Sequence, residues 1–203
     1  MLIKFMADCI GEFDKYTHLG SGFTSQCYTN DGRVIKISPF KTRHEAFYHA
    51  ASASKWYKII GEYLGPYIIP TEFCIARQPI EDRRYSVLQH QPLVRGIPFA
   101  ESLRTGDKKY LGHVNELMNR CVRMGDDLGV MPDLFGTVSS LHDVSTTNNI
   151  IGLVDQCGLP EMPILVDVIP ARLSRWPHTS MVANMLLRYS ASALVAKLDS
   201  KKN

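Results

Sequence analysis

The sequence has no long apolar run and no recognisable export signal. Its longest apolar stretches, such as Ile68-Ile69 and residues 163–166, are far too short to span a bilayer. The opening segment Met1 to Asp8 lacks the apolar core and the small-residue cleavage site of a signal peptide. These absences predict a soluble, cytoplasmic protein that has no membrane partner.

Motifs for disulfides, zinc and two common enzyme classes are also absent. The five cysteines are odd in number and never form a Cys-x-x-Cys pair, and the seven histidines include no His-Glu-x-x-His motif. This pattern favours reduced thiols over a disulfide framework or a zinc site. No Gly-x-Ser-x-Gly elbow or Walker A sequence is present, which argues against serine hydrolases and P-loop proteins.

Neither sign of charge dominates. The net charge is +3, and the only dense basic groups are Arg83-Arg84, Lys108-Lys109 and Lys201-Lys202. Hydrophobic residues make up 45% and charged residues 21% of the chain, as in an ordinary globular protein. Scattered charge of this kind favours a solvated surface over a nucleic-acid-binding patch, so no nucleic-acid partner is expected.

The first half of the chain alternates strand-like and helical patterns. Short β-like runs over 17–38 are joined by a turn at Asn30-Asp31-Gly32, because Asp-Gly and Asn tolerate positive φ. A helix capped by Thr42 is predicted to run to about Tyr63, since its apolar residues recur at helical spacing. Two further strands are predicted over 67–76 and 85–89.

The second half is mainly helical and contains one hairpin. A long helix is predicted over 109–128, followed by a loop over 129–148, strands over 149–154 and 163–169, and a final helix over 180–198. This order predicts an α+β protein with a boundary near residue 90. The expected domains are therefore 1–90 and 91–203.

Two short patterns in the first half suggest phosphate chemistry. Gly20 and Gly22 lie in a hairpin, where backbone can approach a ligand and N–H groups can meet phosphate oxygens. Alone, such a Gly-x-Gly more often marks a turn. Lys36 interrupts an apolar strand between Ile35 and Ile37, so its side chain should point away from theirs.

Glu45 follows Lys36 by nine residues, at the start of the predicted helix. One interpretation is that its carboxylate holds the Lys36 ammonium while that group contacts phosphate. The other is that Glu45 is simply an acidic residue favoured by the helix dipole at the N-terminus.

Taken in order, these patterns resemble the small lobe of the protein-kinase superfamily. The matching features are Leu19-Gly20-Ser21-Gly22, the strand 34–37 and a helix with an early Glu45, although the third glycine of the family is Ser25 here. The resemblance implies a two-lobed kinase-like fold with a β-rich first lobe and a short, mainly helical second lobe. The hinge of the family would fall at 85–91, which implies that Gln89 and Gln91 lie beside the nucleotide.

The resemblance continues more loosely in the second half. It implies that Asp167, after the apolar run 163–166, binds magnesium together with Asn149, although Asn148 leaves this register uncertain by one. The Asp-Phe-Gly motif of the family is Asp167-Val168-Ile169 here. An Asp that starts a turn before Pro170 is the alternative.

The His-Arg-Asp motif of the family is absent, and two residues compete for the catalytic aspartate. Asp133 follows the long helix but precedes Asn149 by 16 residues, against five in the family pattern. Asp143 lies five residues before Asn148 and follows a histidine. Asp133 is favoured, which makes 137–147 an insertion in the catalytic loop.

The resemblance implies an ATP-dependent phosphotransferase that uses ATP and Mg²⁺. The γ-phosphate acceptor would be a protein Ser/Thr or a small-molecule hydroxyl. Only 36 residues follow Asp167, too few for the usual protein-substrate platform, so a partner protein could complete the short second lobe. The alternatives are a non-catalytic kinase-like module that binds nucleotide or protein, and an unrelated α+β domain.

Overall fold

The computed structural model describes residues 4–6, 16–21, 25–80, 83–132, 134, 149–167 and 170–172. The chain divides into two compact units, one formed by Met1–Tyr57 and Pro70–Val94, the other by Lys58–Ile69 and Arg95–Asn203. The predicted final helix over 180–198 lies outside the described residues.

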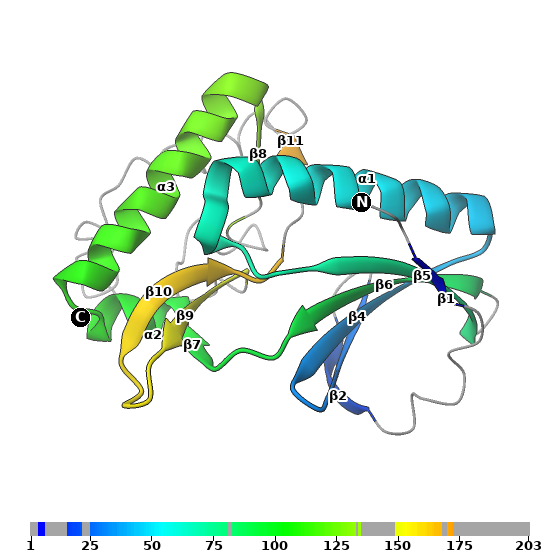
Figure 1. The fold of residues 1–203 in the computed structure, drawn as a ribbon, viewed down its shortest axis with the longest axis horizontal. Coiled ribbons are helices and arrows are strands. Elements are labelled where there is room, and N and C mark those ends of the chain that lie inside the picture. The colour runs from blue at the N-terminus through cyan, green and yellow to red at the C-terminus, as the bar shows by residue number, and fades with distance from the viewer. Residues whose placement is uncertain are drawn as a thin grey trace, which may run out of the picture. The chain divides into compact units, whose positions relative to one another are not determined.

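The first unit is built on a six-stranded sheet in the order β1-β5-β6-β4-β3-β2 (Figure 1). β1 pairs with β5 in parallel, and the other neighbours are antiparallel. The strands are β1 Lys4–Met6, β2 Thr17–Ser21, β3 Gln26–Asn30, β4 Arg33–Phe40, β5 Glu72–Ile80 and β6 Arg83–Pro92. The strands predicted within 17–38 are thus confirmed at the residues that the structure describes, 17–21 and 25–38.

A two-residue turn joins β3 and β4. Asp31 and Gly32 have φ values of 45° and 74°, and the flanking residues Asn30 and Arg33 pair directly. Two successive residues with positive φ match the right-handed twist of the strands that they connect. The Asn-Asp-Gly sequence supplies these conformations at low steric cost, which is why the sequence pattern predicted this hairpin.

The long helix α1, Arg43–Leu64, covers one face of this sheet (Figure 1). Its first turn is closed by a capping box, in which Glu45 N donates to Thr42 Oγ1 at 3.2 Å and Thr42 N donates to Glu45 Oε2 at 3.1 Å. The predicted helix and its cap are confirmed. The apolar residues that α1 packs with the sheet are Ala46, Ala50, Phe73, Ile75 and Val87, with Phe40, Ala53, Tyr57 and Tyr85 at their edge.

The opposite face of the sheet has its own core. The buried residues there are Ile35, Ile37, Cys74, Ala76 and Leu88, with Tyr16 and Tyr28 packed against them. Lys36 pairs with Gln89, which pairs with Phe73 of the α1 core, so Lys36 lies on the face that α1 covers. The predicted orientation of Lys36, opposite to its two isoleucine neighbours, is therefore confirmed.

The second unit combines two small sheets with helices. β7, β9 and β10 form one sheet in the order β10-β9-β7, and β8 pairs with β11 in the other. The strands are β7 Gly96–Pro98, β8 Val130–Pro132, β9 Ile150–Val154, β10 Pro160–Leu165 and β11 Pro170–Arg172, and the helices are η2 Gly65–Tyr67, α2 Phe99–Thr105 and α3 Lys108–Leu128.

α3 confirms the predicted long helix. Asp107 caps its N-terminus by accepting a hydrogen bond from Tyr110 N at 2.8 Å, and Gly129 ends it with a φ of 62°. Its buried stripe consists of Tyr110, Val114, Leu117, Met118, Cys121 and Met124.

Several sequence-based boundaries were wrong. The segment expected to open a strand at Tyr67 is a 3-10 turn, since Gly65 adopts a φ of 57° and Pro66 follows it, so β5 begins only at Glu72. The expected loop after residue 129 contains β8. The hairpin strand predicted to start at Pro163 begins at Pro160 and ends at Leu165. No helix in the described part of the chain is long and apolar enough to cross a membrane.

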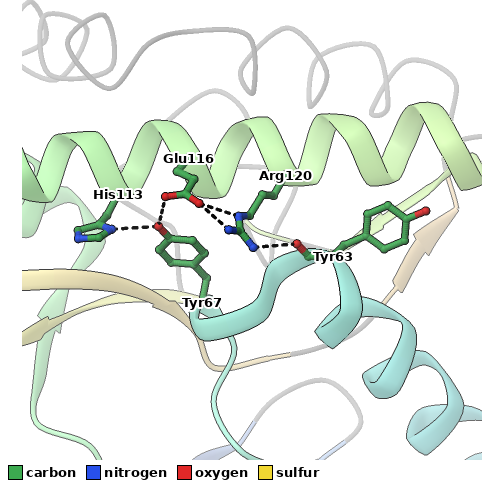
Figure 2. Close-up of polar contacts among 5 residues, drawn as sticks. All are labelled: Tyr63, Tyr67, His113, Glu116 and Arg120. Atoms are coloured by element: carbon green, nitrogen blue, oxygen red, sulfur yellow. Dashed lines mark hydrogen bonds and ion pairs between the residues drawn. The ribbon is translucent and has the colours of Figure 1, made fainter.

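A polar network ties the end of α1 to α3 within the second unit (Figure 2). Tyr67 Oη donates to Glu116 Oε2 at 2.8 Å and lies 2.9 Å from His113 Nδ1. Since the hydroxyl proton is used by Glu116, the His113 ring nitrogen is the donor in the second bond. Arg120 bonds Glu116 Oε1 through Nε at 2.9 Å and the Tyr63 carbonyl oxygen at 3.3 Å. Burial and the Glu116 carboxylate raise the pKa of Tyr67 to about 12.

Candidate functional site

Lys36 lies in a row of side chains that crosses four strands of the first unit. Cys27, Lys36, Gln89 and Phe73 are successive register partners on β3, β4, β6 and β5. The first three are half-buried, whereas Phe73 is buried against α1 and its ring lies 6.0 Å from that of Tyr57. The row therefore passes from the α1 core to a partly open surface that presents an ammonium, an amide and a thiol.

Gln91, on the same face of β6, has a structural role. Its side chain is buried, and Nε2 donates to Thr71 Oγ1 at 3.0 Å. Thr71 N in turn donates to the Tyr57 hydroxyl at 3.0 Å. Gln91 is thereby linked to α1 through Thr71. The predicted contact between Gln91 and a nucleotide remains a prediction.

The Glu45 carboxylate caps the N-terminus of α1. Glu45 is exposed, and Oε2 accepts the Thr42 N–H in the capping box. The α1 residues that pack toward the sheet are Ala46, Ala50, Ala53 and Tyr57, none of which is acidic. Capping alone explains an early Glu at this position, so the predicted pairing with Lys36 stays a prediction.

Only part of the glycine pattern falls within the described residues. Gly20 lies at an irregularity in the β2–β3 pairing, and a Cβ built on it would meet nothing within 4 Å. The space around this backbone is open, as a ligand-binding turn requires. Gly22 lies outside the described residues.

In the second unit, the β9–β10 hairpin brings Asn149 and Asp167 together from distant points in the sequence. Ile150 pairs with Leu165, and Val166 N donates to the Asn149 carbonyl oxygen at 2.8 Å. Asp167 is the next residue after Val166, so it lies at the same end of the hairpin as Asn149. Asn149 is buried, with 8% of its surface exposed, whereas Asp167 is half-buried.

The donor atoms at this end of the hairpin suit a hard cation. An amide oxygen and a carboxylate oxygen are ligands of the kind that Mg²⁺ takes, with phosphate and water oxygens completing its octahedron. Within the described ranges, no group of three or more His, Cys, Asp or Glu side chains could hold a metal ion. Among the described residues, Asn149 and Asp167 are the two oxygen-bearing side chains that meet at this end of the hairpin.

The two candidates for the catalytic aspartate, Asp133 and Asp143, both lie outside the described residues, as does the proposed insertion 137–147. Sequence reasoning missed Cys27 and Thr71. The alternation along β3 was enough to place Cys27 on the Lys36 face, whereas the contact of Thr71 with Gln91 depends on tertiary structure.

No protein-family model matches the chain, and no curated protein matches it. Solved structures that resemble it include the following two. One is Rad53 residues 1–466 in complex with AMP-PNP, with 12% identity, a TM-score of 0.46 and coverage of 93% of this chain and 53% of that one. The other is WbdD, with 13% identity, a TM-score of 0.39 and coverage of 92% and 46%. The chain thus spans about half the length of each. With both TM-scores below 0.5, neither similarity assigns a function to this chain.

Proposed function

We propose that this chain is an ATP-dependent phosphotransferase of the protein-kinase-like superfamily. It binds Mg-ATP and transfers the γ-phosphate to a hydroxyl group of a protein or a small molecule. The observation that supports this most strongly is the pairing of Asn149 with Val166, which brings Asn149 and Asp167 to one end of the β9–β10 hairpin.

Asn149 and Asp167 hold the magnesium ion in this proposal. A magnesium ion held there would supply positive charge that neutralises the phosphates during transfer. The hairpin register keeps residues Asn149 and Asp167 at one end of β9 and β10 before metal binds, which reduces the ordering of the chain that binding would require. Asp167 supplies a negative charge, and Asn149 supplies a neutral oxygen.

Lys36 binds nucleotide phosphates in this proposal. Its alkyl stem lies between the side chains of Cys27 and Gln89, its partners on the neighbouring strands, so the position of the ammonium group is restricted. Backbone N–H groups near Gly20 and Gly22 add donors for phosphate oxygens. Gln89 contributes an amide beside Lys36, and Gln91 supports this face through Thr71.

The acceptor hydroxyl oxygen attacks the γ-phosphorus, and the bond from that phosphorus to the bridging oxygen of the β-phosphate breaks. ADP leaves, and Asp133 or Asp143 accepts the hydroxyl proton. Positioning and charge neutralisation supply most of the rate acceleration.

Thermal unfolding tests the binding step. Mg-ATP at one hundred times its dissociation constant should stabilise the wild type by about 2.7 kcal/mol. Lys36→Met keeps most of the side-chain volume and Asp167→Asn keeps the shape, yet both should lose this stabilisation. Lys109→Met, at an exposed position of α3, should retain it. An unchanged melting temperature of the wild type would overturn the proposal.

Release of labelled phosphate and self-labelling from γ-labelled ATP test the transfer step without knowledge of the acceptor. If the wild type is active and either Asp133→Asn or Asp143→Asn abolishes that activity, the substituted residue is the catalytic base. If the wild type binds nucleotide through Lys36 and Asp167 but shows no turnover, the chain is instead a nucleotide-binding module without catalytic activity.

A further inference from the structure

The face of α1 that points away from the sheet exposes two neighbouring aromatic residues. Phe47 is 55% exposed and Tyr48 is 72% exposed. Ala46 and Ala50, on the opposite side of the helix, are fully buried against the sheet. Large apolar groups gathered on an otherwise polar helix face are a common mark of an interaction surface.

One line of side chains on α1, all exposed except the half-buried Ala51, follows the spacing of a helix-pairing seam. Steps of four and three residues alternate along one line of the helix, which is the pattern of the contact positions in paired helices. We call this line the outer seam; it consists of His44, Tyr48, Ala51, Lys55, Lys58 and Glu62. Tyr48 forms a large projection at one end, with Phe47 beside it. Ala51 is small, so the backbone of a second helix can approach there.

The outer seam is positively charged in its middle. Lys55 and Lys58 are exposed, and neither forms an ion pair with another residue in the part of the chain that the structure describes. Glu62 is the first acidic residue of the seam, one turn beyond Lys58. The other acidic residue of α1, Glu45, lies in the first turn, where its carboxylate accepts the Thr42 N–H.

We propose that the outer seam of α1 binds an acidic amphipathic helix of a partner protein. Apolar side chains of that helix cover Phe47, Tyr48 and Ala51, and its carboxylates face Lys55 and Lys58. The apolar contacts supply the affinity, and the charges select the partner and its direction.

The charge pattern disfavours a second copy of the chain as the partner. An antiparallel pair that covers the apolar end, with Tyr48 of one copy against Ala51 of the other, places Lys55 opposite His44, so neither lysine faces a carboxylate of the seam. A parallel pair places both lysines opposite themselves. Like charges at such positions oppose pairing, so a complementary acidic helix fits better than a copy of α1.

Two synthetic peptides of about three heptads test this proposal. Both carry Leu at the contact positions, and one has Glu and the other Lys at the flanking positions. Fluorescence anisotropy should show that the wild type binds the acidic peptide at least about tenfold more tightly than the basic one. The exposed double variant Phe47→Ser/Tyr48→Ser should weaken binding by a similar factor, with an unchanged circular dichroism spectrum.

Charge reversal provides a second, independent variant. Lys55→Glu/Lys58→Glu should reverse the preference toward the basic peptide. Lys108→Glu/Lys109→Glu makes the same charge change at exposed positions of α3 and should leave the preference unchanged. Lack of binding, equal affinity for both peptides, or the same preference after reversal at 55 and 58 would overturn the proposal. Dimerisation of the wild type that Tyr48→Ser abolishes would also overturn it, in favour of a second copy.

Discussion

The backbone N–H of Val166 donates to the carbonyl oxygen of Asn149 at 2.8 Å, one step beyond the last paired residues of the β9–β10 hairpin. This bond fixes Asp167 beside Asn149 although 17 residues separate them in the sequence. A shift of one residue in the register would turn every side chain of β10 to the other face and separate the two groups. The placement of this pair therefore depends on the packing of β9 and β10.

Asp167, at the open end of the β9–β10 hairpin, and Asp155, at its tip, should differ in metal binding. Asp167→Asn is expected to weaken the affinity for Mg²⁺ or Mn²⁺ in the presence of nucleotide by at least about tenfold, because a charged oxygen ligand is lost. Asp155→Asn changes the same charge at the hairpin tip, where Asp155 Oδ1 accepts the Leu159 N–H at 2.8 Å. This control should bind metal normally, as measured by titration calorimetry. Equal losses in both variants would contradict the assignment.

Gly152 is expected to tolerate no side chain. A Cβ at this position would overlap the Ser102 side chain and lie 2.8 Å from Ser102 Oγ and 3.2 Å from Tyr110 Oη. Ser102 Oγ donates to the Phe99 carbonyl oxygen, so Tyr110 is the donor in the 2.5 Å bond between the two hydroxyls. Gly152→Ala should therefore lower the free energy of unfolding by about 1–3 kcal/mol in urea titrations.

A matched glycine should respond in the opposite direction. Gly112 lies at an exposed position of α3, where an added Cβ meets nothing within 4 Å. Gly112→Ala should raise the free energy of unfolding by roughly 0.5–1 kcal/mol. A loss of stability there, or no loss at Gly152, would show that the packing around these residues differs from that described.

Substitutions in the capping box can separate the two interpretations of Glu45. Thr42→Ala removes a cap hydrogen bond and should cost about 1 kcal/mol of stability. Glu45→Gln keeps an oxygen that can accept the Thr42 N–H, so it should cost less than Thr42→Ala and leave nucleotide binding unchanged. A loss of nucleotide affinity in Glu45→Gln, but not in Thr42→Ala, would instead support pairing of Glu45 with Lys36.

The Tyr67 network should make stability depend on pH in the acid range. The hydroxyl of Tyr67 and then the guanidinium of Arg120 hold the pKa of Glu116 below its ordinary value of 4.5. A depressed pKa stabilises the fold above the unfolded value, and the benefit disappears as pH falls through the folded value. The difference in unfolding free energy between the wild type and Glu116→Gln should thus be largest above about pH 5 and shrink below pH 4.5. A difference that is constant from pH 3 to pH 7 would contradict this account.

Cys27 offers a reporter for nucleotide at the Lys36 face. It is half-buried and pairs directly with Lys36, whereas Cys157 is exposed at the hairpin tip. If nucleotide binds at Lys36, Mg-ATP should slow alkylation of Cys27 and leave Cys157 unaffected. Peptide mass spectrometry after iodoacetamide treatment measures both rates in one sample. Cys121 should remain unmodified in the folded protein, because it is buried and burial raises the pKa of its thiol.

Local patterns predicted the regular elements well. The Asn-Asp-Gly turn, α1 and α3 were identified because φ preferences, capping residues and apolar spacing are encoded within a few neighbouring residues. The orientation of Lys36 followed from strand alternation alone. Such features need no knowledge of distant contacts.

Features that depend on distant partners were missed or misplaced. β1, β7, β8 and β11 are three-residue strands, too short to show a period, and each exists only through its pairing partner. The role of Gln91 depends on Thr71, 20 residues earlier in the sequence. Glu45 had two reasonable interpretations, since a capping box and an ion pair both place an acidic residue in a first helical turn.

The last part of α1 also has a consequence for synthesis on the ribosome. Residues Lys58–Ile69 belong to the second unit, where Ile69 N donates to the carbonyl oxygen of Leu165 and Tyr67 bonds to α3. This segment therefore emerges from the ribosome long before its partners, nearly one hundred residues ahead of Leu165. Until then the apolar end of the helix lacks its packing partners, so a nascent chain halted near residue 95 should bind chaperones. Because each unit is formed by two separate segments, no single cut in the chain yields either unit intact.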